Sequence, residues 1–174
     1  MSANRILIIG PLGAGKSTLA YELNKRYHLS RLNLDEVARN PKNGDYYSWQ
    51  VQEKTLHQFL KTNTSWVIEG CQKSLYEQTN PNLIVDMRIS PLVAVKRFTL
   101  RFIKAKRLIG KRVDKNAPVQ AYHYRKLSIK KILEYNAFNR QINQEIKEYL
   151  SKVNCNVVAC KGIKDYNHIF KLIQ

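Results

Sequence analysis

The sequence predicts an α/β fold in which a five-stranded parallel sheet lies between two layers of helices. Short apolar runs recur along the chain, and amphipathic helical patterns alternate with them. The first apolar run passes directly into a glycine-rich turn and then into a helix. All-apolar runs are typical of parallel strands, because helices cover both faces of such a sheet. The 174 residues are predicted to form a single domain, residues 1–174, without internal repeats.

Strands are expected at five places along the chain. Residues 6–9 form an uninterrupted apolar run, and residues 154–160 form the last short run. The other three strands are expected at residues 30–34, 66–68 and 83–85. Because helical segments separate these runs, neighbouring strands are expected to run parallel, with right-handed crossovers between them.

Helical patterns fill the segments between the strands. The expected helices cover residues 16–27, 45–62, 91–109, 119–150 and 165–173. The third has the clearest start, since Ser90 is a typical capping residue and Pro91 is favoured at the first helical position. It is expected to end before Gly110. Four apolar side chains of the second helix are expected to reach the core: Trp49, Leu56, Phe59 and Leu60.

Positive charge is concentrated in one segment of the chain. The formal net charge is +17, and residues 88–131 contain fourteen Lys and Arg against the single acid Asp114. Three explanations are open on charge alone. The segment could bind a nucleotide, its basic surface could bind a nucleic acid, or it could be a solvated face surrounded by counterions.

The composition argues against a membrane protein. Hydrophobic residues make up 44% of the chain, and no run approaches the roughly 20 apolar residues of a membrane span. The first residues lack the pattern of a secretion signal, so a cytoplasmic protein without membrane contacts is expected. The cysteines do not have the spacing of a zinc site, and we expect reduced packing residues at Cys71, Cys155 and Cys160.

The turn after the first strand matches the phosphate-binding pattern G-x-x-x-x-G-K-[ST]. Glycines let consecutive backbone N–H groups surround phosphate oxygens, and the start of the next helix adds a favourable dipole. Lys16 can reach the β and γ phosphates of ATP, and the Ser17 hydroxyl can bind Mg²⁺. The predicted binding residues are Gly10, Gly13, Ala14, Gly15, Lys16, Ser17 and Thr18.

The third glycine makes the stretch "GPLGAGKST" similar to the G-x-x-G-x-G-K-[ST] loop of adenylate kinase, shikimate kinase and their relatives. The words "NLDEVAR", "WVIEG" and "VVACKGIKDY" occur in the order that this superfamily shows. More narrowly, "LDE", "WVIEG", "LIVDMRISP" and "GKR" followed by Asp114 resemble adenylate-kinase-like proteins described as DNA-topology-modulation proteins.

The resemblance implies a three-layer P-loop NTPase fold with a small basic lid, and an ATP-dependent phosphotransferase that uses Mg²⁺. Residues 35–64 match the acceptor-binding segment, and residues 101–125 match the lid. Lys161 and Gly162 match the loop that embraces the adenine ring. The acceptor is open, because Asn33 stands where shikimate kinases carry an acid and Arg39 is the only arginine of the expected acceptor segment.

Phosphoryl transfer requires positioned cations and carboxylates around the moving group. Arg97 and Arg101 are four residues apart, which places them on one helix face. Two acids, Asp35 and Glu69, come at predicted carboxyl ends of strands, where they could serve the acceptor or Mg²⁺, or cap a following helix. The predicted catalytic residues are Lys16, Asp35, Glu69, Arg97, Arg101 and Arg112. Asp86 also ends a predicted strand. It is a weaker candidate site residue than Glu69, because the fourth strand of the resembled family usually has a structural role.

Two functions remain open on the sequence. The first is transfer of the γ-phosphoryl group of ATP to a small molecule, with a nucleoside or nucleotide among the candidates. The second is a nucleotide-regulated DNA-binding protein of the topology-modulation type, without kinase turnover. The short length and the lid-like segment argue against a hydrolysing NTPase switch. The sequence leaves open whether the chain is a monomer or a homodimer.

Overall fold

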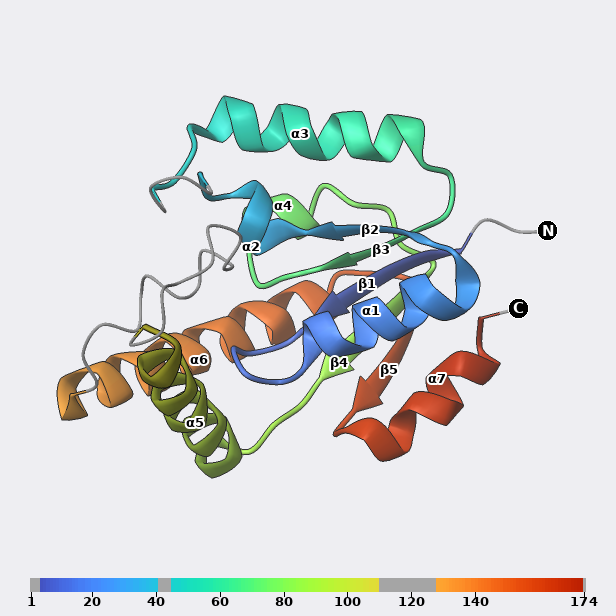
Figure 1. Ribbon diagram of the computed structural model, residues 1–174. Helices are drawn as coiled ribbons and strands as arrows, with labels where there is room; N and C mark the ends of the chain where they lie inside the picture. Colours follow the sequence, from blue (N-terminus) through green and yellow to red (C-terminus); the bar gives the residue numbers. More distant parts are fainter. Residues whose placement is uncertain (1–3, 41–44, 110–127, 174) are drawn as a thin grey trace.

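The five strands form one parallel sheet. A computed structural model describes residues 4–40, 45–109 and 128–173, without the side chains of residues 102 and 104–109. The strand order is β2-β3-β1-β4-β5, so the first strand is central (Figure 1). The strands are β1 (Arg5–Ile9), β2 (Ser30–Asn33), β3 (Trp66–Glu69), β4 (Leu83–Met87) and β5 (Asn156–Cys160).

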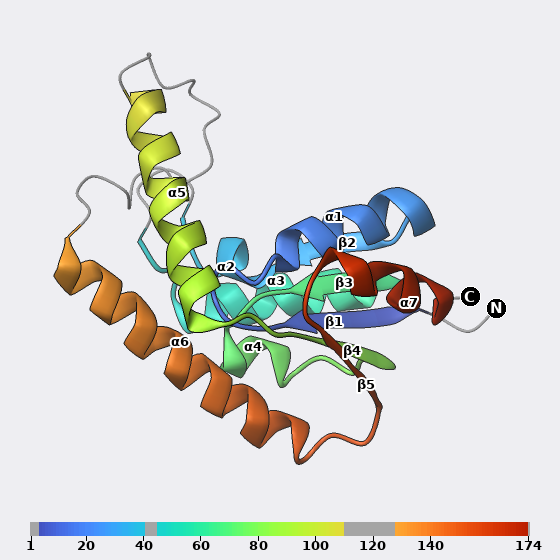
Figure 2. The ribbon, with the colours of Figure 1, turned by 90° about the horizontal axis from the view of Figure 1, so that it is seen from below.

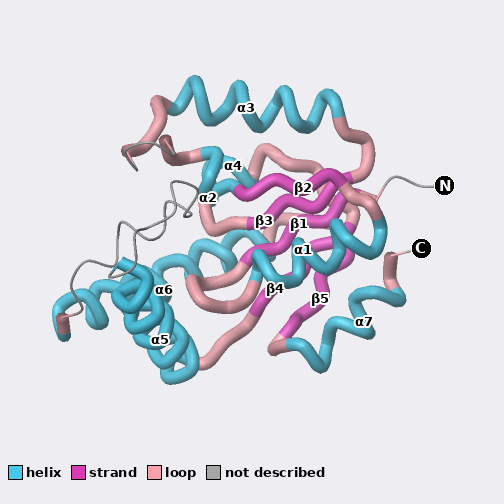
Figure 3. The backbone as a smooth tube through the Cα atoms, viewed as in Figure 1, coloured by secondary structure: helices cyan, strands magenta, loops and turns pink. Residues whose placement is uncertain are grey.

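Helices cover both faces of this sheet. They are α1 (Lys16–Tyr27), α2 (Leu34–Val37), α3 (Trp49–Thr62), α4 (Lys73–Tyr76), α5 (Pro91–Ile109), α6 (Ile129–Leu150) and α7 (Tyr166–Lys171), with a short 3₁₀ turn, η2 (Ile163–Asp165). Seen along the sheet, α1 and α7 lie on one side and α4 and α6 on the other (Figure 2). The tube drawing looks onto one face of the sheet, with α1 crossing over the strands (Figure 3).

Alternate side chains of the central strand enter two separate cores. Ile6 and Ile8 pack with buried residues of α1 and α7, whereas Leu7 and Ile9 pack with residues of α2, α3, α4 and α6. All four side chains are at most 1% exposed. Successive residues of a strand point to opposite faces, so burial of both faces requires the continuous apolar run that predicted this strand.

The register brings the ends of the strands to one edge of the sheet. Glu69 at the end of β3 lies beside Ile8 of β1 and Asn33 of β2, and Asp86 in β4 lies beside Ile9 of β1. Strands β2 and β3 lie on one side of the central strand β1, and β4 and β5 lie on the other side, so the strand order reverses at β1. A crevice at such a reversal of strand order is the common ligand site of open α/β sheets.

The five predicted strands and their parallel arrangement are confirmed. Leu34 is a correction, because it begins α2 rather than ending β2. Trp49 is also a correction: it is 40% exposed at the start of α3, so it does not belong to the core, although Leu56 is fully buried. The sequence did not predict the short helices α2 and α4, since four residues are too few to show a helical period. Helix α6 begins at Ile129, and residues 119–127 of the expected helix lie outside the described residues.

We expect Gly10→Ala to destabilise the protein strongly. A Cβ at Gly10, which has φ +152°, would lie 2.5 Å from the carbonyl oxygen of Met87 in the neighbouring strand. Overpacking against backbone, together with a disfavoured φ, costs on the order of 2–4 kcal/mol. Gly162→Ala is the matched control, because nothing lies within 4 Å of its added Cβ. Urea unfolding of both variants measures the difference, and equal stability would contradict the expectation.

Candidate functional site

The turn between β1 and α1 is a compact glycine-rich loop, residues 10–18. Gly13 has φ +82° and Gly15 has φ +101°, which are left-handed conformations that glycine adopts without strain. Helix α1 begins directly after Gly15 and has no side-chain cap. The loop therefore ends at a helix N-terminus, where backbone N–H groups lack partners within the helix.

The side chain of Lys16 folds back into this loop. Its Nζ donates to the carbonyl oxygens of Gly10 at 2.9 Å and Pro11 at 3.2 Å. Lys16 is only 6% exposed. A buried ammonium group needs such partners, because an unpaired buried charge is very costly. The loop thus holds one positive charge within the curve of its own backbone.

The next three carbonyl groups of the loop accept hydrogen bonds from two distant helices. The Leu12 oxygen accepts from the Tyr135 hydroxyl of α6 at 2.7 Å. The oxygens of Gly13 and Ala14 accept from Nη1 of Arg97 in α5, at 2.8 Å and 3.3 Å. Side chains that are far away in the sequence therefore take up the acceptor side of the loop.

The donor side of the loop has far fewer partners. Within the described part of the chain, no acceptor is found for the backbone N–H groups of Gly13, Gly15, Lys16 and Ser17. The carbonyls are held and these four N–H groups are not, so the loop presents donors together with the Lys16 charge. Such an arrangement favours an anion with several acceptor oxygens, as a phosphate chain has.

A carboxylate lies beside the first turn of α1. The Ser17 hydroxyl donates to Oε2 of Glu69 at 2.9 Å, and Nη2 of Arg31 donates to Oε1 of the same carboxylate at 2.7 Å. The Glu69 side chain is 1% exposed, and that of Arg31 is 30% exposed. A hydroxyl and a carboxylate in contact form a hard oxygen pair of the kind that Mg²⁺ prefers.

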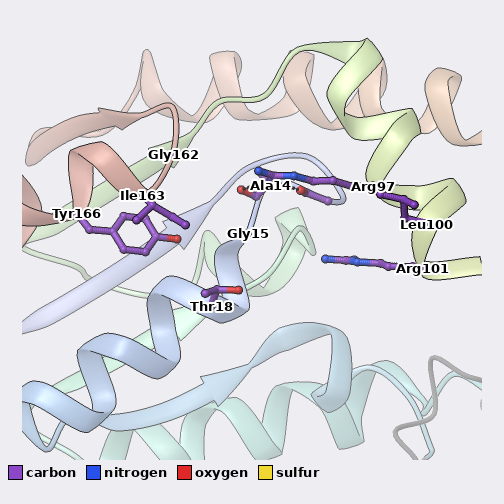
Figure 4. A pocket seen from close by; sticks show the side chains of 10 residues that line it. Ala14, Gly15, Thr18, Arg97, Leu100, Arg101, Gly162, Ile163 and Tyr166 are labelled. Atoms are coloured by element: carbon purple, nitrogen blue, oxygen red, sulfur yellow. Dashed lines mark hydrogen bonds between the residues drawn. The ribbon is translucent and has the colours of Figure 1, made fainter. Parts of the chain in front are cut away.

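A cleft of about 300 Å³ opens on the other side of the loop. It lies between the loop, α5 and the segment that leads into α7 (Figure 4). Arg97 and Arg101 reach toward it from one face of α5, as the close view shows. The lining residues are Gly13, Ala14, Gly15, Thr18, Arg97, Leu100, Arg101, Gly162, Ile163 and Tyr166. The cleft thus combines two cations with apolar side chains and the end of an aromatic ring.

Asp35 lies in the first turn of α2 and does not cap this helix. The cap is the Asn33 side chain, which accepts from the N–H groups of Asp35 and Glu36. The Cys71 thiol donates to Oδ1 of Asp35 at 3.4 Å. Asp35 and Cys71 follow shortly after the carboxyl ends of β2 and β3, at the same edge of the sheet where the glycine-rich loop follows β1. A partly exposed carboxylate is therefore available beside the loop.

Burial and the neighbouring Asp35 carboxylate raise the pKa of the Cys71 thiol to about 12. The folded-state pKa lies above the ordinary value of 9.0, so this contribution to stability is complete below pH 9 and is lost as the pH rises toward 12. We expect Cys71 and buried Cys160 to resist iodoacetamide at pH 8, whereas half-buried Cys155 reacts first. Mass spectrometry of the alkylated native protein checks the order, and early labelling of Cys71 would contradict it.

No protein-family model matches the chain, and no curated protein matches it either. Function is therefore inferred from the geometry of the loop and the cleft. Across the part of the chain that the structure describes, no helix is long and apolar enough to span a membrane. The same residues contain no cluster of three or more His, Cys, Asp and Glu side chains that could hold a metal ion.

Most of the predicted site residues lie around the loop. Those in the loop, its carboxylate and its cleft are Gly10, Gly13, Ala14, Gly15, Lys16, Ser17, Thr18, Glu69, Arg97, Arg101 and Gly162. Lys161 is exposed and does not line the cleft; its backbone N–H donates to Asp165. Arg112 and most of the predicted lid, residues 110–125, lie outside the described residues. Asp86 is paired with Arg88 at 2.7 Å.

Sequence reasoning missed four residues that touch the site. Arg31 binds Glu69, Cys71 binds Asp35, and Tyr135 and Asn139 bind the backbone of Leu12. None belongs to a recognisable motif. The one available signal was the spacing of Tyr135 and Asn139, which are four residues apart and so share a helix face.

Proposed function

We propose that this chain is a P-loop kinase that transfers the γ-phosphoryl group of ATP to a small molecule. The observation that carries the proposal is the division of the glycine-rich loop. Side chains hold its carbonyls from Gly10 to Ala14, whereas the N–H groups of Gly13, Gly15, Lys16 and Ser17 have no acceptor among the described residues. The buried Lys16 ammonium adds charge at the same place. This is the donor arrangement that a chain of phosphates requires.

The cleft beside the loop suits the rest of a nucleotide. Ile163 and Tyr166 supply apolar and aromatic surface at one end, and Arg97 and Arg101 supply charge at the other. A volume of about 300 Å³ is at the lower end of the range for small-molecule sites. Arginine guanidinium groups bind phosphate oxygens well because their donors form a planar fork.

Ser17 and Glu69 are the residues that would hold Mg²⁺. Their oxygens are 2.9 Å apart at the helix N-terminus, so the donor set fits a hard cation that retains water and phosphate ligands. When bound, Mg²⁺ neutralises charge on the phosphate oxygens. Arg31 keeps the Glu69 carboxylate in place through its ion pair.

Asp35 is the residue proposed to receive the acceptor. It is a partly exposed carboxylate on the β2–β3 side of the loop. In the proposed step, the acceptor oxygen bonds to the γ phosphorus while the bond from that phosphorus to the β–γ bridging oxygen breaks, which releases ADP. The acceptor hydroxyl loses its proton to Asp35. Lys16 and the arginines of α5 stabilise the charge on the moving group.

ATP consumption with Mg²⁺ tests this proposal directly. The panel of acceptors is nucleosides, nucleoside monophosphates and small hydroxylated metabolites, with Lys16→Ala as the blank. We expect consumption that depends on one acceptor and disappears in the blank.

The basic composition supports the alternative, nucleotide-regulated DNA binding, since the net charge is +17. If no acceptor stimulates ATP consumption, and DNA binding persists in Lys16→Ala and weakens by orders of magnitude with added salt, the kinase proposal fails in favour of this alternative.

A further inference from the structure

Helix α6 holds the middle of the glycine-rich loop from outside. Leu12 N–H donates to Oδ1 of Asn139 at 2.8 Å, and the Leu12 carbonyl accepts from the Tyr135 hydroxyl at 2.7 Å and more weakly from Nδ2 of Asn139 at 3.4 Å. Asn139 is 7% exposed and Tyr135 is 8% exposed. Two nearly buried polar side chains are thus directed at a single residue of the loop backbone.

Helix α5 is joined to the same contact. The Tyr135 ring stacks on Phe98, with ring centroids 4.4 Å apart and an interplanar angle of 26°. Arg97, the residue before Phe98, donates to the carbonyls of Gly13 and Ala14. A Cβ on Gly13 would lie 2.7 Å from the Tyr135 hydroxyl oxygen, so the side chain of Tyr135 in α6 comes very close to the loop backbone.

The contact controls the direction of one peptide oxygen. Glycine-rich backbone has many accessible conformations, and a carbonyl turned toward the phosphates would repel their oxygens. Hydrogen bonds to α6 keep the Leu12 carbonyl on the outside of the loop. A loop that is already ordered loses less conformational entropy when an anion binds, so its affinity is higher.

We propose that Tyr135 and Asn139 are positioning residues that hold the loop in its anion-binding conformation, and that the contact of α6 with α5 thereby sets the affinity for the phosphates of the nucleotide. This inference rests on the proposed function. Neither side chain lines the cleft, so both act through the loop backbone rather than on the nucleotide itself.

Calorimetric titration of the full chain with MgATP measures the effect. The variants are Tyr135→Phe, which keeps the ring stack, Asn139→Leu, which keeps the volume, and the double variant. We expect each single variant to raise Kd about threefold to tenfold, from the lost bonds to a buried peptide group. The increase in Kd for the double variant is expected to exceed the product of the two single increases, because the Leu12 carbonyl then has no side-chain donor left among the described residues.

Tyr149→Phe is the matched control on the same helix. Its ring packs at a tilt of 54° against Tyr76 in the core, and loss of its hydroxyl should leave the Kd for MgATP unchanged. Hydrogen exchange of the backbone amides of Leu12 and Ala14 without nucleotide is the second readout, because these N–H groups donate to Asn139 and to the Pro11 carbonyl oxygen. Exchange is expected to be faster in the two positioning variants, at a thermal stability comparable to that of the control.

The outcomes separate the two proposals. If the wild-type chain does not bind MgATP, the proposed function is overturned, and unchanged exchange of the loop amides would independently overturn the positioning role. If the wild-type chain binds MgATP and the double variant binds it equally well, the positioning role fails and the proposed function stands. A loss of affinity that merely follows a loss of folded protein would also overturn the positioning role.

Discussion

Lys16→Ala is expected to lower kcat/KM for ATP about 10²- to 10³-fold, because it removes a preorganised, buried charge from the proposed phosphate site. Lys16 is 6% exposed and its Nζ is held by the carbonyls of Gly10 and Pro11. The charge is therefore already placed before any phosphate arrives. We expect MgATP binding to weaken as well, since the ammonium would bind the phosphates of the ground state too.

Lys25→Ala is the control for this prediction. Lys25 lies in the last turn of the same helix α1 and is exposed, so the variant removes one positive charge far from the loop. Initial rates at saturating acceptor, together with thermal unfolding of both variants, measure the two effects separately. Equal turnover in Lys16→Ala and wild type would contradict the catalytic role of the lysine.

Glu69→Gln is expected to reduce both stability and Mg²⁺-dependent turnover. The substitution keeps the shape of the side chain but removes the charge that pairs with Arg31 and accepts from Ser17. Breaking a fully buried ion pair costs about 3–5 kcal/mol, and partial exposure of Arg31 reduces the expected loss to about 1–3 kcal/mol. The apparent affinity for Mg²⁺ in the presence of ATP should fall about 10- to 100-fold.

Asp86→Asn is the matched control for Glu69→Gln. Asp86 is a buried carboxylate near the end of β4, which lies on the opposite side of β1 from β3, and it also pairs with an arginine, Arg88, at 2.7 Å. Arg88 is 59% exposed on its side chain, so the control should cost less stability and leave the Mg²⁺ dependence unchanged. Magnesium titrations of ATP turnover distinguish the two variants. The same Mg²⁺ dependence in Glu69→Gln as in wild type would contradict the proposed role of Glu69.

Local pattern was sufficient for the large elements of this fold. The run before Gly10 predicted a buried parallel strand, because only burial of both faces requires four apolar residues in succession. Ser90 and Pro91 predicted the start of α5, and the Ser90 hydroxyl does accept from the Val93 N–H. The pattern failed at Trp49, since helical spacing cannot tell a core face from a partly exposed one at the end of a helix.

Neighbouring residues along the chain specify the glycine-rich loop, the lysine within it and the α/β order of the elements, so these could be predicted from local pattern. The side chains that hold the loop could not be predicted in this way. Arg97 reaches it from α5, and Tyr135 and Asn139 reach it from α6 more than 120 residues away. Contacts between such distant residues follow from how helices pack on the sheet, and no local spacing encodes that packing.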